Sequence, residues 1–340
     1  MKNLSFLNQI MFFINNVFAL LFLASFTLPY VPPKSFPLLS ILSLSVPLII
    51  FVHIGFIAYW ILAGLKKQLL LSSFCILIAI GFSFFPYKFN KKTVISGSSF
   101  SVMNYNVRIF NKYNWISNDQ IPEQISEFIK KQDPDLLSIQ EYSPAKNLTL
   151  NFPYKYEKLN GRKNSVGLAL FSNYPIVNQG SLDFEESYNN AIFIDVVKNH
   201  DTLRVYNVHF ESFGIPPDSL DLNLNERKSK KLIYRLKTSF TKQQFQVEKF
   251  LEHKSKCNYK VIISGDFNNT AYSWVYRKTK GDLTDSFLAA GKGFGKTYPF
   301  NGYPLRIDFI LSDKQFSVNE HMNFNIKLSD HEPIMARLSQ

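Results

Sequence analysis

Residues 260–268 read KVIISGDFN, and this stretch carries the features that best predict the fold of the second half of the chain. Its first residues are largely β-branched and apolar, which is typical of a buried strand, and the glycine that follows favours a tight turn. Asp266 and Asn268 lie two positions apart in that turn, so both side chains can face one ligand. The alternative is an Asx-turn, in which both side chains bond only to local backbone groups.

Other predicted strands also end in polar residues. We expect strands at residues 99–107, 136–140, 167–172, 191–197, 203–209, 260–264, 306–311 and 334–338, and helices at residues 121–132 and 224–253. The polar residues within or beside these strands are Asn106, Glu141, His209, Asp308, Asp330 and His331. Because loops at one sheet edge commonly build a binding site, these strand ends indicate one polar site in an α+β domain.

Six short motifs occur in one order along this half. They are NYNV (104–107), SIQE (138–141), NVHF (207–210), GDFN (265–268), RIDFI (306–310) and SDHEP (329–333). Each motif alone is common, but together and in this order they resemble the motif series of the endonuclease/exonuclease/phosphatase superfamily, in its deoxyribonuclease and sphingomyelinase-like branch. The resemblance covers about residues 100–340. It implies a four-layered α/β sandwich, in which two packed, mainly antiparallel sheets are flanked by helices.

Three residues are predicted to hold a metal ion. Glu141 is the strongest candidate, because Mg²⁺ prefers hard oxygen ligands and is usually held by one or two carboxylates together with water and phosphate. Asn106 offers both a donor and an acceptor without adding charge, and the resemblance implies a position at the metal. Asp330 is expected to bind the metal or its water. The predicted cofactor is therefore Mg²⁺, with Mn²⁺ as the alternative.

Five residues receive catalytic roles from the same resemblance. Asp266 would orient or deprotonate the attacking water, and Asn268 would donate to a phosphoryl oxygen. Asp308 would fix the tautomer of His331, which contacts the phosphate. His209 matches the histidine that acts as general acid in the deoxyribonuclease-like and sphingomyelinase-like branches. The expected activity is metal-dependent phosphodiester hydrolysis.

The substrate stays open between a nucleic acid, cut by an endonuclease, and a phospholipid head group. Arg108 stands where abasic-site repair nucleases of the superfamily have an aspartate, which argues against DNA repair. Residues 304–308 lack the tryptophan-containing segment of inositol-polyphosphate phosphatases, which argues against that class. A scaffold that binds phosphorylated ligands without turnover is the alternative to an enzyme.

The first hundred residues differ sharply from the rest. They contain seven lysines and no Asp, Glu or Arg, whereas residues 101–340 contain 31 Lys+Arg and 26 Asp+Glu. Three apolar segments, at about residues 10–30, 37–65 and 69–85, are near the roughly 20 residues that cross a bilayer. We therefore predict an all-α membrane anchor over residues 1–95 and a catalytic domain over residues 96–340. A cleaved signal peptide is the alternative for the first segment, and His53 is expected to have an interfacial or packing role.

The lysines that flank these segments favour a cytoplasmic N-terminus and an exported catalytic domain on a bacterial-type inner membrane. The expected partners are thus the lipid bilayer and a phosphodiester substrate.

Three further segments allow two interpretations each. Residues 226–260 contain 11 Lys+Arg and three Glu around apolar positions, which fits a solvated outer helix or a helix that meets anionic head groups or nucleic acid. Residues 213–217 form either a mobile or membrane-touching rim of the site or a plain surface loop. Residues 271–277 fit core packing or stacking on a ligand.

Overall fold

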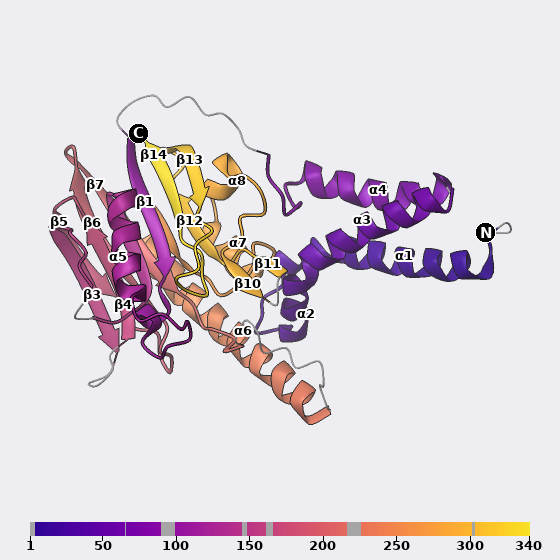
Figure 1. Cartoon of the computed structure of the whole chain (residues 1–340), viewed down its shortest axis with the longest axis horizontal. Helices are drawn as coiled ribbons and strands as arrows, with labels where there is room; N and C mark the ends of the chain where they lie inside the picture. The colour runs from indigo at the N-terminus through magenta and orange to yellow at the C-terminus, as the bar shows by residue number, and fades with distance from the viewer. Residues whose placement is uncertain are drawn as a thin grey trace.

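Two six-stranded sheets form the second half of the chain, as Figure 1 shows for the computed structural model. The structure describes residues 4–64, 66–89, 99–144, 148–160, 166–215, 226–300 and 303–340. The first sheet has the order β13-β14-β1-β2-β4-β3 and the second has the order β5-β6-β7-β8-β12-β9. Each sheet contains one parallel pair, β1 with β2 and β7 with β8, and its other pairs are antiparallel.

The strands of the first sheet are β1 (Ser99–Asn106), β2 (Leu136–Tyr142), β3 (Tyr154–Asn160), β4 (Val166–Ser172), β13 (Ser317–Asn323) and β14 (Ile334–Ser339). Those of the second sheet are β5 (Ile176–Ser181), β6 (Asn190–Lys198), β7 (Asp201–His209), β8 (Lys260–Asp266), β9 (Thr284–Asp285) and β12 (Asp308–Ser312). A short hairpin of β10 (Tyr298–Phe300) and β11 (Tyr303–Leu305) lies beside them.

The sheets pack face to face through a shared apolar core, which includes Val102, Leu136, Ile194, Val205 and Ile262. Helix α5 (Ile121–Gln132) packs on the outer face of the first sheet. Helices α6 (Glu226–Ser255) and α7 (Trp274–Lys280) pack on the outer face of the second, and the short α8 (Ser286–Ala290) lies beside β12 and β13. The predicted four-layered sandwich is therefore confirmed.

All eight predicted strands are present, but β3, β5 and β13 were not predicted, and neither were the short strands β9, β10 and β11. The three longer strands carry polar side chains such as Lys155, Glu157 and Asn178, and many of their residues are only partly buried. β3, β5 and β13 lie at sheet edges, where one side of the strand stays open to solvent. The prediction at residues 271–277 is resolved as core packing, because Tyr272, Trp274, Val275 and Tyr276 are all buried.

The N-terminal region contains four α-helices rather than three continuous ones. They are α1 (Phe6–Ser25), α2 (Pro37–Leu42), α3 (Val46–Leu62) and α4 (Lys66–Gly81), with the 3-10 turns η1 (Leu28–Tyr30) and η2 (Ser43–Ser45) between them. The predicted second segment changes to a 3-10 turn at η2, just before Pro47, whose nitrogen cannot donate a helical hydrogen bond. The predicted third segment is a helix of 16 residues, about 24 Å long and short of a full span.

Two segments, Phe6–Tyr30 and Pro37–Leu62, are long and apolar enough to cross a membrane by length and composition. Only 22% and 39% of their most apolar windows are buried, which is low for core helices of a soluble domain. In Figure 1, α1, α3 and α4 extend away from the sheets, and the first turn of α1 lies farthest from them.

His53 packs inside this helical region, as the packing interpretation predicted. Its Nδ1 lies 3.0 Å from Ser72 Oγ, and that hydroxyl donates to Asn15 Oδ1 at 2.8 Å. All three side chains are buried, and they come from α3, α4 and α1. The network therefore ties the three helices together by hydrogen bonds.

Candidate active site

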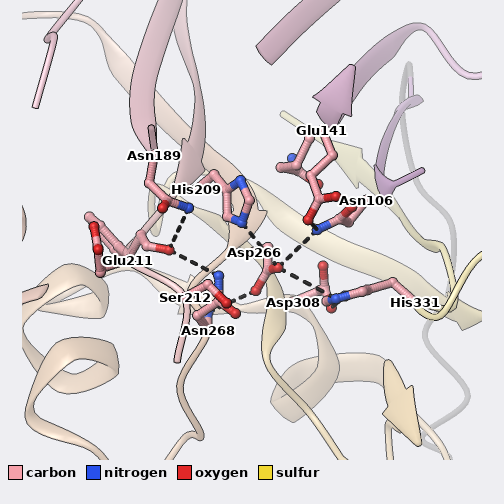
Figure 2. Close-up of polar contacts among 12 residues, drawn as sticks. Asn106, Glu141, Asn189, His209, Glu211, Ser212, Asp266, Asn268, Asp308 and His331 are labelled. Carbon is pink, nitrogen blue, oxygen red and sulfur yellow. Dashed lines mark hydrogen bonds and ion pairs between the residues drawn. The ribbon is translucent and has the colours of Figure 1, made fainter. Parts of the chain in front are cut away.

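The predicted polar residues meet at one edge of the sandwich, where the strands of both sheets end (Figure 2). Strand pairing brings some of them side by side, because His209 on β7 is opposite Asp266 on β8, and Asp266 is opposite Asp308 on β12. Gly265 makes the β7–β8 pairing possible. A Cβ at this position would lie 1.9 Å from the carbonyl oxygen of Val208, so no other residue fits without a backbone shift.

Asp266 is the centre of the cluster. Its Oδ2 accepts a hydrogen bond from Asn106 Nδ2 at 3.1 Å and lies 3.6 Å from Nε2 of both His209 and His331. Its Oδ1 accepts from the backbone N–H of Asn268 at 2.7 Å. The Asx-type hydrogen bond considered for this turn is thus present, but it uses one oxygen only. The other oxygen faces the site.

Asp308 and His331 form a buried pair. His331 Nδ1 lies 2.9 Å from Asp308 Oδ2, and Asp308 Oδ1 accepts from Asn104 Nδ2 at 3.3 Å. Burial lowers the pKa of His331, but the carboxylates of Asp308 and Asp266 outweigh it and raise this pKa to about 10. His331 is therefore a cation at neutral pH and can attract an anionic phosphate.

The other two titratable groups differ from this pair. Burial and the negative charge of Asp308 raise the pKa of Asp266 above its ordinary value, against the opposing charge of His331. A carboxylate with a raised pKa is a better proton acceptor than an ordinary one. Burial and the charge of His331 lower the pKa of His209 to about 3, so this imidazole is neutral until an anion comes close to it.

Glu141 lies at the mouth of the cluster, where a bulge separates Gln140 from Tyr142 in β2. Its φ of 51° is in the left-handed region, which is uncommon outside glycine and recurs at functional sites. Glu141 Oε1 accepts from Asn106 Nδ2 at 3.3 Å. Burial and the nearby charge of Asp330 raise the pKa of Glu141, so a cation beside these two carboxylates would be stabilised.

Two groups of side chains could hold a metal. Ligand atoms of Asp266, Asp308 and His331 lie within 4.8 Å of one another, but His331 Nδ1 is engaged with Asp308 and the ring is cationic. The carboxylates of Glu141 and Asp330 line one cavity, and the Asn106 amide bonds to Glu141 at its edge. Because Mg²⁺ takes oxygen ligands from carboxylates and amides, this second set fits the ion better.

Asn268 lines the same cavity, with a φ of 47°. Its Nδ2 donates to the carbonyl oxygen of Phe210 at 2.9 Å, which holds the turn after β8 against the end of β7. The structure therefore brings all eight predicted residues into one site.

Several residues around this site were not predicted to belong to it, although Arg108 was noted for its position in the motif series. Arg108 Nε lies 3.2 Å from Asp330 Oδ2, and its guanidinium lies 4.3 Å from the centre of the Trp115 ring. The ring of Tyr298 lies 4.9 Å from that of His331. Gln140 Nε2 donates to Asn104 Oδ1 at 2.8 Å and to Asn207 Oδ1 at 2.6 Å, which links the two sheets beneath the site. The motifs contain these amides, but only the packed sheets reveal their contacts.

The site opens into a cavity of about 710 Å³. Its lining joins the polar residues to side chains of three other regions: η2 and α3, the segment after β7, and the β10–β11 hairpin. The N-terminal helical region thus forms part of the wall.

Solved structures share this fold. A humanized TDP2 from D. rerio aligns with a TM-score of 0.55 at 15% identity, over 72% of this chain and 100% of that one. Proteins of the endonuclease/exonuclease/phosphatase type from Beutenbergia cavernae and Bacteroides vulgatus both align with a TM-score of 0.52. The Beutenbergia cavernae protein is 15% identical over 71% of this chain and 72% of its own. The Bacteroides vulgatus protein is 18% identical over 72% of this chain and 99% of its own. These likenesses concern the fold.

Family comparisons assign the two halves separately. No protein with a curated function matches the chain significantly. Residues 8–85 match a family described as a domain of unknown function. Residues 103–331 match the endonuclease/exonuclease/phosphatase family. Because this second match spans more than half of the chain, the protein belongs to the endonuclease/exonuclease/phosphatase family.

Proposed function

We propose that this protein is a membrane-anchored, Mg²⁺-dependent hydrolase of phosphodiester bonds, with a nucleic acid or a phospholipid head group as substrate. Its family contains phosphodiesterases and phosphatases. The observation that carries the proposal is the meeting in one cavity of His331, of the Asp266 carboxylate 3.6 Å from it, and of the two further carboxylates of Glu141 and Asp330. Phosphoester hydrolysis needs these three elements.

Each residue has a defined task in the proposed reaction. Asp266 orients a water molecule and takes its proton as the water oxygen bonds to phosphorus. His331, held by Asp308, neutralises charge on the phosphoryl oxygens, and Asn268 lies beside it. The approach of an anionic phosphate raises the pKa of His209, so that the imidazole takes up a proton from solvent. The ester P–O bond then breaks, and the leaving oxygen receives that proton.

Glu141, Asp330 and Asn106 would hold the divalent cation. When bound, such an ion neutralises phosphate charge and favours the leaving oxygen. Mn²⁺ suits the same oxygen ligands.

The test uses the full-length protein in detergent with Mg²⁺ and four probes: bis-p-nitrophenyl phosphate, plasmid DNA, RNA and sphingomyelin. We expect turnover of at least one probe, abolished in Glu141→Ala. Glu185→Ala is the matched control, because Glu185 is exposed and only pairs loosely with Lys249 at 3.8 Å. If no probe is turned over with any divalent ion while Glu141→Ala still binds ligand, the scaffold alternative is correct.

Membrane anchoring is the second part of the proposal, with the anchor over residues 1–95 and the catalytic domain over residues 96–340. The two long apolar segments and their low burial support it. An exported domain follows from the lysine distribution. Reporter fusions placed after Lys92 test the orientation: alkaline phosphatase should be active and a cytoplasmic reporter inactive. The opposite pattern would reverse the topology.

A further inference from the structure

The N-terminal helical region forms one wall of the catalytic cavity. Leu44, Ser45 and Leu48 line the same cavity as Asp266 and His331. These three residues belong to η2 and the start of α3, more than 200 residues before Asp266 in the chain. A segment that served only as a tether would have no reason to enter the active site.

Specific contacts hold this wall in place. Thr270 Oγ1 donates to the carbonyl oxygen of Ser43 at 3.1 Å, directly beside the lining residues. Farther along α3, the ring of Phe51 lies 6.3 Å from that of Tyr303 on β11. Before α2, the backbone N–H of Lys34 donates to Gln244 Oε1 of α6 at 2.7 Å. Three separate contacts thus attach the N-terminal helical region to the domain.

A second group of apolar side chains lines the cavity, and α6 supports part of it. Phe213, Ile215, Phe300 and Tyr303 line the cavity. The ring of Phe213 packs 4.9 Å from that of Phe240 on α6. Arg235 donates to the carbonyl oxygen of Gly214 at 2.9 Å, and Ser239 donates to that of Ser212 at 3.1 Å. The described part of the segment at residues 213–217, residues 213–215, therefore lines the cavity and contacts α6; Pro216 and Pro217 lie outside the described residues.

The cavity has a polar floor and apolar walls, which suits an amphipathic substrate. Within the described part of the chain, Arg108 is the one Lys or Arg side chain that lines it, and Arg108 is paired with Asp330. Nucleic-acid binding relies on several cations that contact successive phosphates. One arginine and a single polar floor fit one phosphate group, and the leucines fit an alkyl chain.

Apolar side chains at and near the cavity wall are also exposed on the helices. Leu48 lines the cavity and is nevertheless 54% exposed, and Leu38 and Leu42 of α2 are exposed nearby in the chain. If these helices are embedded as proposed, a lipid chain reaches the cavity along this surface without crossing water. The driving force is the removal of apolar surface from water.

We propose that the helical region is part of the active site and selects a lipid phosphodiester, with its phosphate at His331 and its alkyl chain along Leu44 and Leu48. This inference rests on the proposed phosphodiesterase function. It assigns the domain of unknown function a role in substrate choice as well as in anchoring.

The experiment uses the full-length protein in mixed micelles with Mg²⁺. The substrates are methyl, octyl and hexadecyl p-nitrophenyl phosphate, which share one scissile bond and one leaving group and differ only in chain length. We expect kcat/KM to rise with chain length. In the double variant Leu44→Ser/Leu48→Ser, the loss on the hexadecyl ester should exceed the loss on the methyl ester by about ten-fold or more.

Leu77→Ser is the matched control, because Leu77 is exposed on α4 and does not line the cavity. It should keep the ratio of the two esters within about two-fold of the unmodified protein, which removes any effect of micelle partitioning. If the double variant does not fold, the chain-length series on the unmodified protein still tests the idea.

The outcomes separate the two proposals. No hydrolysis of even the methyl ester with Mg²⁺ or Mn²⁺ would sink the phosphodiesterase function itself. Hydrolysis of the methyl ester with no gain from chain length, or an equal loss on all esters in the double variant, would overturn the lipid inference alone. So would faster cleavage of a DNA or RNA oligonucleotide than of the hexadecyl ester.

Discussion

Replacing Asp308 by asparagine should move the pH range in which the enzyme works. The asparagine keeps the shape of the side chain and removes the charge 2.9 Å from His331 Nδ1. Asp308 is the main carboxylate that raises the pKa of His331 to about 10, from an ordinary value of 6.5. In the variant, burial lowers the pKa of His331, and the remaining carboxylates of Asp266 and Asp330 raise it. Taking burial and these two charges as roughly offsetting, the pKa returns to near its ordinary value.

The size of the effect follows from the protonated fraction of His331. At pH 8 nearly all of the unmodified protein carries the cation, whereas a pKa near 6.5 leaves roughly 3% protonated, so kcat/KM should fall about 30-fold. At pH 6 most of the variant is protonated and the loss should be less than about two-fold. Loss of the Asp308 charge also lowers the pKa of Asp266. More of the variant then carries the ionised Asp266 carboxylate that takes the proton from water at acid pH, so its activity there should be less affected.

The assay is hydrolysis of bis-p-nitrophenyl phosphate by full-length protein with saturating Mg²⁺, measured as the ratio of unmodified protein to variant between pH 6 and pH 9. Asp282→Asn is the control, since this side chain is fully exposed and pairs with Lys314 rather than with a histidine. A ratio that stays constant across this range would refute the reasoning, because it would mean that the protonation state of His331 does not limit the reaction.

Three further predictions follow from the same contacts. EDTA should abolish hydrolysis and Mg²⁺ or Mn²⁺ should restore it, while His331→Ala should lower kcat far more than metal affinity; loss of metal binding in that variant would contradict the assignment. Burial lowers the pKa of His321 to about 4 from 6.5. As the pH falls, the unfolded chain therefore binds a proton at this histidine before the folded protein does. Roughly 3 kcal/mol of stability should be lost as the pH falls from about 6.5 to 4. Denaturation of His321→Gln should lack this component, with the exposed His200→Gln as control. Gly265→Ala should lower the free energy of unfolding by about 1–3 kcal/mol, because the new Cβ clashes with the backbone of Val208, and the melting temperature should fall with it. An unchanged melting temperature would contradict the close approach of β7 and β8.

Much of the site was predictable because its residues lie at strand ends. Alternation of apolar and polar residues and runs of β-branched residues predict where a buried strand ends. The side chain at that position then lies at the edge of the sheet. For this reason Asn106, Glu141, His209 and Asp266 could be named from the sequence. The edge strands β3, β5 and β13 were not predicted, because exposed polar side chains hide the period that marks a strand.

Contacts between distant segments could not be predicted in this way. Asn104 and Asn207 both accept a hydrogen bond from Gln140, which links the two sheets. Their positions in the motifs do not reveal this contact. The same holds for Tyr298, which reaches His331 from a hairpin that forms only beside the packed sheets.

The sequence alone determined two things about this protein: an apolar first half, and a second half whose polar strand ends carry the residues of a phosphoesterase site. The apolar half and the strand ends follow from local composition and from periods of two and 3.6 residues, which need no tertiary information. The phosphoesterase character follows from the resemblance of the six motifs to the endonuclease/exonuclease/phosphatase family. Only the tertiary structure decided that Leu44 and Leu48 line the cavity that holds Asp266 and His331. That contact depends on how η2 and α3 pack against the domain, and packing between segments more than 200 residues apart leaves no local signal in the chain.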